Sequence, residues 1–351
     1  ACDGPKSTVR SSLGLDFDGQ IFEDNFLIAD VTMDAEFPTE RRFWFDPPFN
    51  KGQSALLHKQ PDGVWRIDLQ LGWDIDKETE KREENVIPRL KAMLGEKVNF
   101  KLEWVSIYTF QCMKMEKFKH GRILFAGDSA HQVSPFGARG ANSGVQDVDN
   151  LCWKLKLVLE ERAPVSLLDT YNFERVFAAE ENIINSSRST DFITPKSKIS
   201  MAFRNAVLEL SERYDFARPL VNSGRLSTPS TYDNSRLNSL DGMKNPTRSR
   251  VGAPCPDLPF NDDYLLNKTG NQFCVLTFNC KITETLEDFF LPVKTIEITE
   301  GDENKDFMRD RFLGQYKEAV YLLRPDQHIA GRWPSYDKEI LLEALKKATD
   351  N

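Results

Sequence analysis

Residues 121–159 hold most of the side chains that could do chemistry. Apolar residues at 123–126 predict a short buried strand, and a loop rich in glycine and proline follows it. Apolar residues then return at helical spacing, at Val145, Val148, Leu151, Cys152, Leu155, Val158 and Leu159. A strand that passes through such a loop into a helix presents unpaired backbone N–H groups, which suit an anionic or electron-rich ligand.

The two ends of this loop have their own candidate residues. Asn142 or Ser143 can cap the helix, and Asp147 would place negative charge in its first turn. Asp128 lies at the end of the strand, where its carboxylate can either bind a ligand or cap the turn that follows. The sequence therefore predicts a ligand site where strand, loop and helix meet.

This junction resembles the second flavin-binding motif of the para-hydroxybenzoate hydroxylase-type, single-component FAD monooxygenases. The resemblance is carried by Gly127, Asp128, Ala130, His131, Pro135, Gly137, Gly140, Asn142 and residues 149–151 and 153–155. Residues 2–10, CDGPKSTVR, resemble the family's DGxxSxxR motif in the expected order, and residues 171–175 resemble its YxxER motif. Residues 322–333, LLRPDQHIAGRW, resemble the C-terminal domain of the phenol hydroxylase and 3-(3-hydroxyphenyl)propionate hydroxylase branch.

The resemblance implies an FAD-dependent oxidoreductase. In that family NAD(P)H reduces FAD, the reduced flavin reacts with O2, and a flavin C4a-hydroperoxide hydroxylates a phenolic or other activated aromatic ring. Such a site needs no metal, because the cofactor carries the hard chemistry. The implied partners are a small aromatic substrate and O2, and a homodimer contact is one role open to the C-terminal domain.

The resemblance also implies roles for residues of the second motif. Asp128 would accept hydrogen bonds from the ribityl hydroxyls of FAD. Gly137 and Gly140 would let the backbone approach the isoalloxazine ring where a Cβ atom would collide, or would serve turn geometry alone. Backbone N–H groups of Ala141 and Asn142 would lie near flavin O2 and N1, where the helix dipole favours the negative charge of reduced flavin.

Five further residues receive an expected role in the same way. Pro135 would line the reaction side of the flavin ring and is the single catalytic candidate. Asp3 and Arg10 of the first motif resemble residues that contact FAD and NAD(P)H. Arg139 would add positive charge near the flavin, with a solvated surface arginine as the alternative. His131 is expected to be a structural hydrogen-bonding residue rather than a base.

No expected strand in the chain is followed by GxGxxG, the dinucleotide-binding fingerprint that should hold the FAD pyrophosphate at a helix N-terminus. In the resembled family this fingerprint precedes DGxxSxxR. We therefore expect the first part of the flavin domain to be missing and the 351-residue chain alone not to be a working monooxygenase. Two alternatives stay open: a non-catalytic flavoenzyme remnant or association module, and a related FAD epoxidase or halogenase.

The expected fold class is mixed α/β and α+β. Residues 1–11 and 112–221 would form the C-terminal part of a Rossmann-like FAD-binding domain, and residues 12–111 an antiparallel-sheet substrate domain. A linker rich in Ser, Pro, Asn, Arg and Gly would wrap the surface at 222–260, ahead of a thioredoxin-like domain at 261–351.

The pattern of residues also predicts individual elements. Strands are expected at 25–33, 41–45, 54–59, 64–71, 100–113, 273–278, 293–298, 319–323 and 328–332, and helices at 167–187, onward to 216, at 283–290 and at 337–348. A helical segment at 77–94 should be kinked or divided by Pro88. Tyr108 is expected to be buried in the sheet, with a position facing the substrate as the alternative.

The overall composition narrows the class of protein. A formal net charge of -8 argues against a nucleic-acid surface, and no apolar run approaches the length of a membrane span. The six cysteines form no CxxC pair and no zinc-binding spacing, so we expect reduced thiols in a cytoplasmic protein. Cys274 and Cys280 are too far apart for a redox pair, so the C-terminal domain is expected to be structural.

Overall fold

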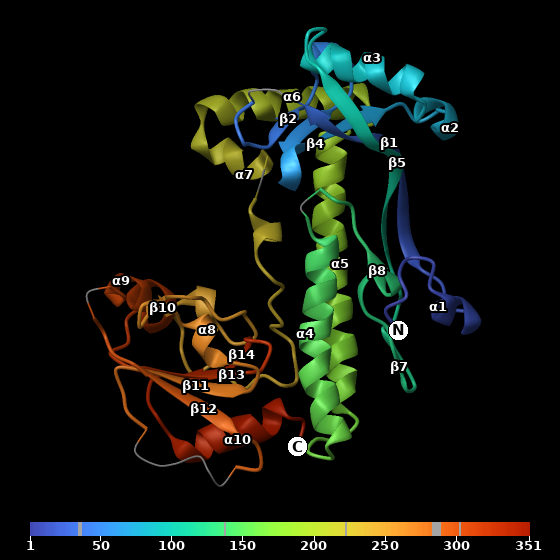
Figure 1. Ribbon diagram of the computed structural model, residues 1–351. Helices are drawn as coiled ribbons and strands as arrows, with labels where there is room; N and C mark the ends of the chain where they lie inside the picture. Colours follow the sequence, from blue (N-terminus) through green and yellow to red (C-terminus); the bar gives the residue numbers. More distant parts are fainter. Residues whose placement is uncertain (34–36, 137, 222, 283–288, 302) are drawn as a thin grey trace.

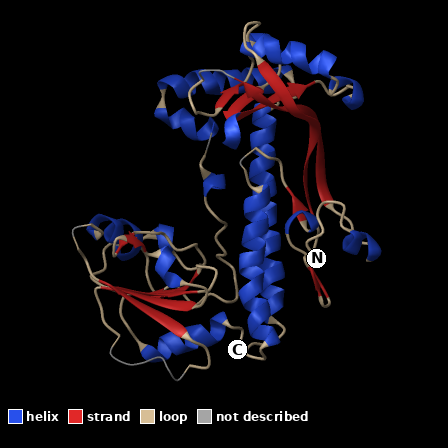
Figure 2. Ribbon diagram, in the orientation of Figure 1, coloured by secondary structure: helices blue, strands red, loops and turns tan. Residues whose placement is uncertain are grey.

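A computed structural model describes residues 1–33, 37–136, 138–221, 223–282, 289–301 and 303–351. Figure 1 shows three parts: a curled sheet at one end, a pair of long helices through the middle, and a C-terminal domain beside the other end of those helices. Helices and strands are both abundant (Figure 2), which confirms the expected mixed fold class.

The first sheet has six strands in the order β2-β3-β4-β1-β5-β8, and all of its pairs are antiparallel. Its strands are β1 (Asp18–Met33), β2 (Arg42–Trp44), β3 (Ala55–Lys59), β4 (Val64–Leu71), β5 (Phe100–Lys114) and β8 (His131–Gln132). The expected alternation holds, because Trp65, Ile67, Leu69 and Leu71 are buried against one face. Short 3-10 turns lie at η1 (Pro48–Asn50) and η2 (Pro61–Gly63).

Helix α3 (Glu83–Leu94) covers that face of the sheet with Val86, Leu90 and Leu94. The expected division of this segment at Pro88 is wrong. The break falls earlier, after α2 (Lys77–Glu80), and α3 continues through Pro88. Packing of the apolar side of α3 against the sheet outweighs the hydrogen bond that proline cannot make.

Two long helices form the middle of the molecule, α4 (Gly140–Leu159) and α5 (Leu167–Ile193). They are followed by α6 (Lys198–Arg213), η4 (Asp215–Ala217) and α7 (Arg218–Val221). The apolar spacing predicted α4 correctly but not its buried face. Val145, Val148 and Leu159 are exposed, whereas the buried positions are Ser143, Asp147, Asn150, Trp153, Lys154 and Leu157.

The segment before the glycine loop is shorter than the expected buried strand. The strand covers Ile123–Leu124 (β7), which is half-buried and pairs antiparallel with β6 (Lys119–His120) across a turn at Gly121. Phe125 and Ala126, which complete the apolar run, are buried but lie outside the strand. Helix α1 (Thr8–Ser12) begins within the first motif and includes Arg10.

The C-terminal domain has a four-stranded sheet in the order β12-β11-β13-β14. Its strands are β11 (Phe273–Phe278), β12 (Val293–Ile298), β13 (Ala319–Leu323) and β14 (Ile329–Trp333). β12 runs parallel to β11, whereas β13 and β14 form an antiparallel hairpin on its other side, as a thioredoxin-like order predicts. Helix α10 (Lys338–Ala348) packs on this sheet, and most of the helix expected at 283–290 lies outside the described residues.

Smaller elements complete the C-terminal region: η5 (Arg225–Ser227), η6 (Thr247–Ser249), β9 (Pro259–Phe260), β10 (Asp263–Tyr264), α8 (Leu266–Thr269), α9 (Lys305–Met308) and the π-turn η7 (Arg309–Leu313). The expected linker at 222–260 does more than wrap the surface. Tyr232, Leu237, Met243 and Val251 are buried, so this segment contributes to the cores that it connects. The domain boundaries stay predictions.

The cysteines are free thiols in the structure. Cys255 and Cys274 are buried in the C-terminal core, where burial raises the pKa of both thiols, that of Cys274 to about 12. Burial also raises the pKa of Cys280 to about 11. Thiols held in the neutral form are poor nucleophiles, which agrees with packing roles.

Candidate functional site

The loop that follows β7 leaves Asp128 open to solvent. Gly127–Ser129 forms a single 3-10 turn (η3), with Gly127 at φ +66°. Ser129 beside it is buried, and its hydroxyl donates to the carbonyls of Ala1 and Ala126 at 2.8 and 2.9 Å. Asp128 itself has no hydrogen-bond partner among the described residues. The turn is therefore anchored on one side while its carboxylate stays free for a ligand.

Helix α4 begins at Gly140, earlier than expected, and neither Asn142 nor Ser143 caps it. The cap position is Arg139, which makes no side-chain capping bond. Asn142 Nδ2 instead donates to the Ala138 carbonyl at 2.6 Å, and the Ser143 hydroxyl accepts from Asn182 at 2.7 Å. The partner of Asn142 is one turn away and that of Ser143 is on α5, so the helix N-terminus keeps its positive end without a side-chain cap.

Asp147 is a buried anchor for the loop, not a first-turn residue as expected. Its carboxylate accepts from the Gly127 amide at 2.8 Å, and it lies 2.7 Å from His131 Nε2. Arg175 Nε of α5 donates to its other oxygen at 2.6 Å. Burial opposes the charge of Asp147, but Arg175, His131 and these hydrogen bonds lower its pKa overall. His131 thus has the structural role that the sequence predicted.

Arg175 extends this anchor to the segment before the C-terminal domain. Its Nη1 donates to the Tyr232 hydroxyl at 2.7 Å, and its Nη2 donates to the Ser143 carbonyl at 3.2 Å. The Tyr232 ring stacks on His328 with ring centroids 4.5 Å apart. Burial raises the pKa of Tyr232 to about 12, so the hydroxyl stays neutral and can accept this bond.

The first motif packs against the same loop. Arg10 is buried, and its guanidinium donates to the Ser129 carbonyl at 2.9 Å and the Pro5 carbonyl at 2.7 Å. The exposed Asp3 carboxylate accepts from the Val9 amide at 3.2 Å, and its hydrogen bond from Ser7 contributes most to lowering its pKa. The structure therefore brings both motifs together, with Arg10 as a tie between them.

The remaining predicted site residues lie between Pro135 and Asn142. Pro135, Ala141 and Asn142 are exposed, and Gly137 lies outside the described residues. A Cβ atom on Gly140 would meet only Val133 Cγ2 at 3.9 Å, an ordinary contact, so within the protein this glycine prevents no collision. Its expected role toward a ligand stays a prediction.

The alternative of a solvated surface Arg139 is wrong. Arg139 is 4% exposed, and its guanidinium donates to Asn182 Oδ1 at 3.1 Å and to the Thr228 carbonyl at 3.3 Å. Burial, together with the charges of Arg225 and Arg175, lowers its pKa. Its position beside the first turn of α4 directs the side chain inward against α5, which local sequence does not reveal.

The first sheet faces the glycine loop with aromatic side chains. Phe136 of the loop packs on Phe26 and Phe110, with ring centroids 5.4 and 5.3 Å away. Tyr108 is paired with Phe26 in the register of β1 and β5, yet it is 49% exposed, so the expectation of a buried tyrosine is wrong. Strand alternation puts Tyr108 on the face opposite α3, where the covering helix does not reach.

The same face holds a group of titratable side chains. Asp30 and Arg66 form a bidentate pair at 2.8 Å, while Asp68 Oδ1 and His58 Nδ1 are buried without a hydrogen-bond partner among the described residues. Burial raises the pKa of Asp68 to about 6, against the lowering effect of Arg66. The face toward the loop is thus more polar than the face under α3.

A buried charge cluster joins α4, α5 and the C-terminal domain. Glu174 of α5 accepts from Arg324 at 2.6 and 2.9 Å and from Lys154 at 2.7 Å, and Arg324 also pairs with Asp326. Asn150 donates to both Glu174 and Asp326 at 2.8 and 3.1 Å. All of these side chains are 0–2% exposed.

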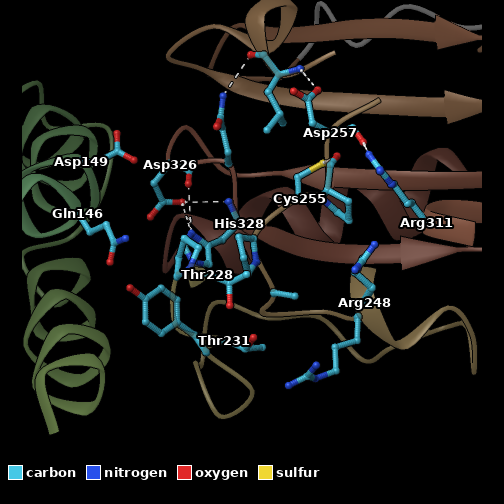
Figure 3. A pocket seen from close by; sticks show the side chains of 18 of the residues that line it. Gln146, Asp149, Thr228, Thr231, Arg248, Cys255, Asp257, Arg311, Asp326 and His328 are labelled. Atoms are coloured by element: carbon cyan, nitrogen blue, oxygen red, sulfur yellow. Dashed lines mark hydrogen bonds and ion pairs between the residues drawn. The ribbon is translucent and has the colours of Figure 1, made fainter. Parts of the chain in front are cut away.

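A cavity of about 700 Å³ lies beside this cluster, between α4 and the C-terminal domain. Figure 3 shows Gln146 and Asp149 of α4 on one side of it and Arg248 and Arg311 on the other. Much of its charge is already paired within the protein, since Arg250 binds Asp233 at 2.7 Å and Asp326 binds Arg324. The described residues include no group of His, Cys, Asp and Glu able to hold a metal ion.

Several residues of this region were not identified as site residues from the sequence. Arg175 and Glu174 lie in the segment that resembles YxxER, and Arg324 and Asp326 lie in LLRPDQHIAGRW. The sequence therefore marked these four residues but predicted no role for them. Tyr232 had no signal, because it lies in a segment with linker-like composition. Among the described helices, none has the length and apolar character required to cross a membrane.

The geometry agrees with what comparison with known proteins shows. The family described as FAD binding domain matches residues 1–186, and this chain belongs to it. The expected resemblance to the FAD-dependent aromatic hydroxylases is confirmed, because the matching family binds FAD and the curated relatives carry hydroxylase names.

Individual relatives are more distant. The 3-(3-hydroxy-phenyl)propionate/3-hydroxycinnamic acid hydroxylase of Escherichia coli O8 (strain IAI1) is 25% identical over 354 residues, covering 94% of this chain and 63% of the relative. The protein of the same name from Shigella sonnei (strain Ss046) is also 25% identical, with the same coverage. The chain thus spans 63% of the length of these relatives.

Solved structures show the same fold. Aklavinone-11 hydroxylase in a ternary complex with FAD and aklavinone matches with a TM-score of 0.76 at 19% identity, over 100% of this chain and 67% of that chain. The flavin-dependent monooxygenase PieE in complex with FAD and substrate matches with a TM-score of 0.75 at 21% identity, over 99% and 69%. At these identities the likeness establishes the fold alone.

Proposed function

We propose that this protein is an FAD-dependent monooxygenase that uses NAD(P)H as electron donor and O2 to hydroxylate a phenolic or other activated aromatic ring. The observation that carries the proposal is the free Asp128 carboxylate beside the uncapped N-terminus of α4. Both features belong to one loop. Asp147 and Arg10 anchor it through hydrogen bonds to the backbone of Gly127 and Ser129. The names of the relatives support the reaction class.

The residues present fit FAD. The Asp128 carboxylate can accept hydrogen bonds from ribityl hydroxyls, and nothing in the described chain competes for it. The N–H groups of Ala141 and Asn142 point out of the first turn of α4, where the dipole favours negative charge on the flavin pyrimidine. When bound, FAD supplies the redox and oxygen-transfer chemistry.

The rest of the site would position the ring and limit access of water. Pro135 is exposed on the loop and would line the reacting side of the flavin. Tyr108, half-exposed on the sheet face toward the loop, would contact an aromatic substrate. Phe26, Phe110 and Phe136 form an apolar wall beside that space, which would exclude water from the reaction.

Titration of the purified protein with FAD tests the proposal. Asp128→Ala should weaken FAD binding by about 1.5–3 kcal/mol, because a charge-assisted hydrogen bond is lost, while the thermal unfolding midpoint stays unchanged. Asp74→Ala is the matched control, since Asp74 is also exposed but lies in the loop after β4. Equal FAD affinity for Asp128→Ala and wild type would refute the assignment of Asp128.

A further inference from the structure

We propose that Tyr232, which lies outside the flavin-binding motifs, is a positioning residue for the loop that carries Asp128. The inference rests on the proposed function and goes beyond it, because it makes the segment before the C-terminal domain part of the flavin site. The connection is a buried chain of hydrogen bonds from Tyr232 through Arg175 and Asp147 to Gly127.

Each link of this chain is short and protected from water. The Tyr232 hydroxyl lies 2.7 Å from Arg175 Nη1, Arg175 Nε lies 2.6 Å from Asp147 Oδ1, and the Gly127 amide lies 2.8 Å from Asp147 Oδ2. Tyr232, Arg175 and Asp147 are 3%, 1% and 0% exposed. Groups so little exposed have few alternative partners, so we expect removal of one group to move its neighbours.

Tyr232 is well held at its own end of the chain. Its amide donates to the Gly252 carbonyl at 2.9 Å, and its carbonyl accepts from Asn238 Nδ2 at 2.7 Å. The ring stacks on His328, whose Nε2 lies 3.2 Å from the Ser230 carbonyl. A Cβ atom on Gly252 would come within 2.6 Å of the Tyr232 carbonyl oxygen, which shows how closely the two segments approach.

At its other end, the chain of hydrogen bonds fixes the backbone position of the loop that would contact a ligand. Gly127 adopts a left-handed φ of +66° directly before Asp128, and its amide is oriented by the Asp147 carboxylate. Arg175 also holds the Ser143 carbonyl in α4 at 3.2 Å. A shift of Arg175 would therefore change the spacing between the Asp128 turn and the first turn of α4, the two elements that would contact FAD.

The test compares two matched variants of the full chain, Tyr232→Phe and Tyr321→Phe. Both delete one buried hydroxyl and keep the ring, but the Tyr321 hydroxyl donates to the Phe312 carbonyl at 2.6 Å inside the C-terminal core. Tyr232→Phe should raise the FAD dissociation constant about tenfold and alter the visible circular dichroism of the bound flavin. Tyr321→Phe should lower the thermal midpoint and leave both flavin measurements at wild-type values.

The outcomes separate the two proposals. Wild-type protein that is produced with every segment its gene encodes and still binds no FAD would refute the proposed function itself. Wild-type protein that binds FAD, with Tyr232→Phe matching Tyr321→Phe in affinity and flavin spectrum, would overturn the role of Tyr232. If Tyr232→Phe does not fold, His328→Ala serves instead, because it removes the ring stack and leaves the hydroxyl; the same tests apply, with a smaller change expected.

Discussion

Replacement of Glu174 by glutamine should destabilise the protein strongly, because it breaks the buried cluster that joins α4 and α5 to the C-terminal domain. The carboxylate accepts from Arg324, Lys154, Asn150 and Ser235, and it is fully buried. Burial alone would raise its pKa, but Arg324 and then Lys154 outweigh burial and keep the group ionised.

The expected loss of unfolding free energy is about 3–5 kcal/mol. A glutamine amide presents two N–H donors to a site built entirely from donors, and it leaves the charge of Arg324 balanced by Asp326 alone. Lys154→Met should cost far less than Glu174→Gln, because burial already lowers the pKa of Lys154 to about 8 and Arg324 alone makes two bonds to the carboxylate.

Urea unfolding followed by circular dichroism measures these differences. Glu40→Gln is the control, since Glu40 forms an ion pair of 2.7 Å with Arg42 in which both side chains are at least one-third exposed. It should change the free energy of unfolding by less than about 1 kcal/mol. A loss below about 1 kcal/mol for Glu174→Gln, or an equal loss for Lys154→Met, would refute the reasoning that the carboxylate is the centre of the cluster.

Two further predictions concern single residues. Burial raises the pKa of Asp68 to about 6, so the folded state holds its proton more tightly than the unfolded state; wild-type stability should therefore fall as pH rises from about 4 to 6, by up to about 3 kcal/mol. Asp68→Asn should lack this fall, and parallel pH profiles of the urea midpoint for the two proteins would contradict it. Ala138 adopts φ +54°, so Ala138→Gly should raise the free energy of unfolding by about 1 kcal/mol, whereas Ala141→Gly in the first turn of α4 should lower it. A lower thermal midpoint for Ala138→Gly would show that the strain is absent.

The local elements were determined by the sequence to a large extent. The strands at 64–71 and 273–278 match β4 and β11, and the long helices α4 and α5 begin and end near the expected residues. These elements follow from hydrophobic periodicity and from turn residues, which act over a few positions of the chain. The motifs that led to the flavin family are likewise short and contiguous.

The partners of the motif residues were decided by tertiary structure. The local sequence predicts Asp147 in the first helical turn, yet its carboxylate is the buried partner of Gly127, His131 and Arg175. The local sequence places Tyr232 in a linker, yet its hydroxyl accepts a hydrogen bond from Arg175. Such contacts join positions 16 to 57 residues apart, and only the packing of α4, α5 and the segment around Tyr232 against one another buries them. In that space a charge or a hydroxyl must find a partner, and spacing along the chain does not say which one.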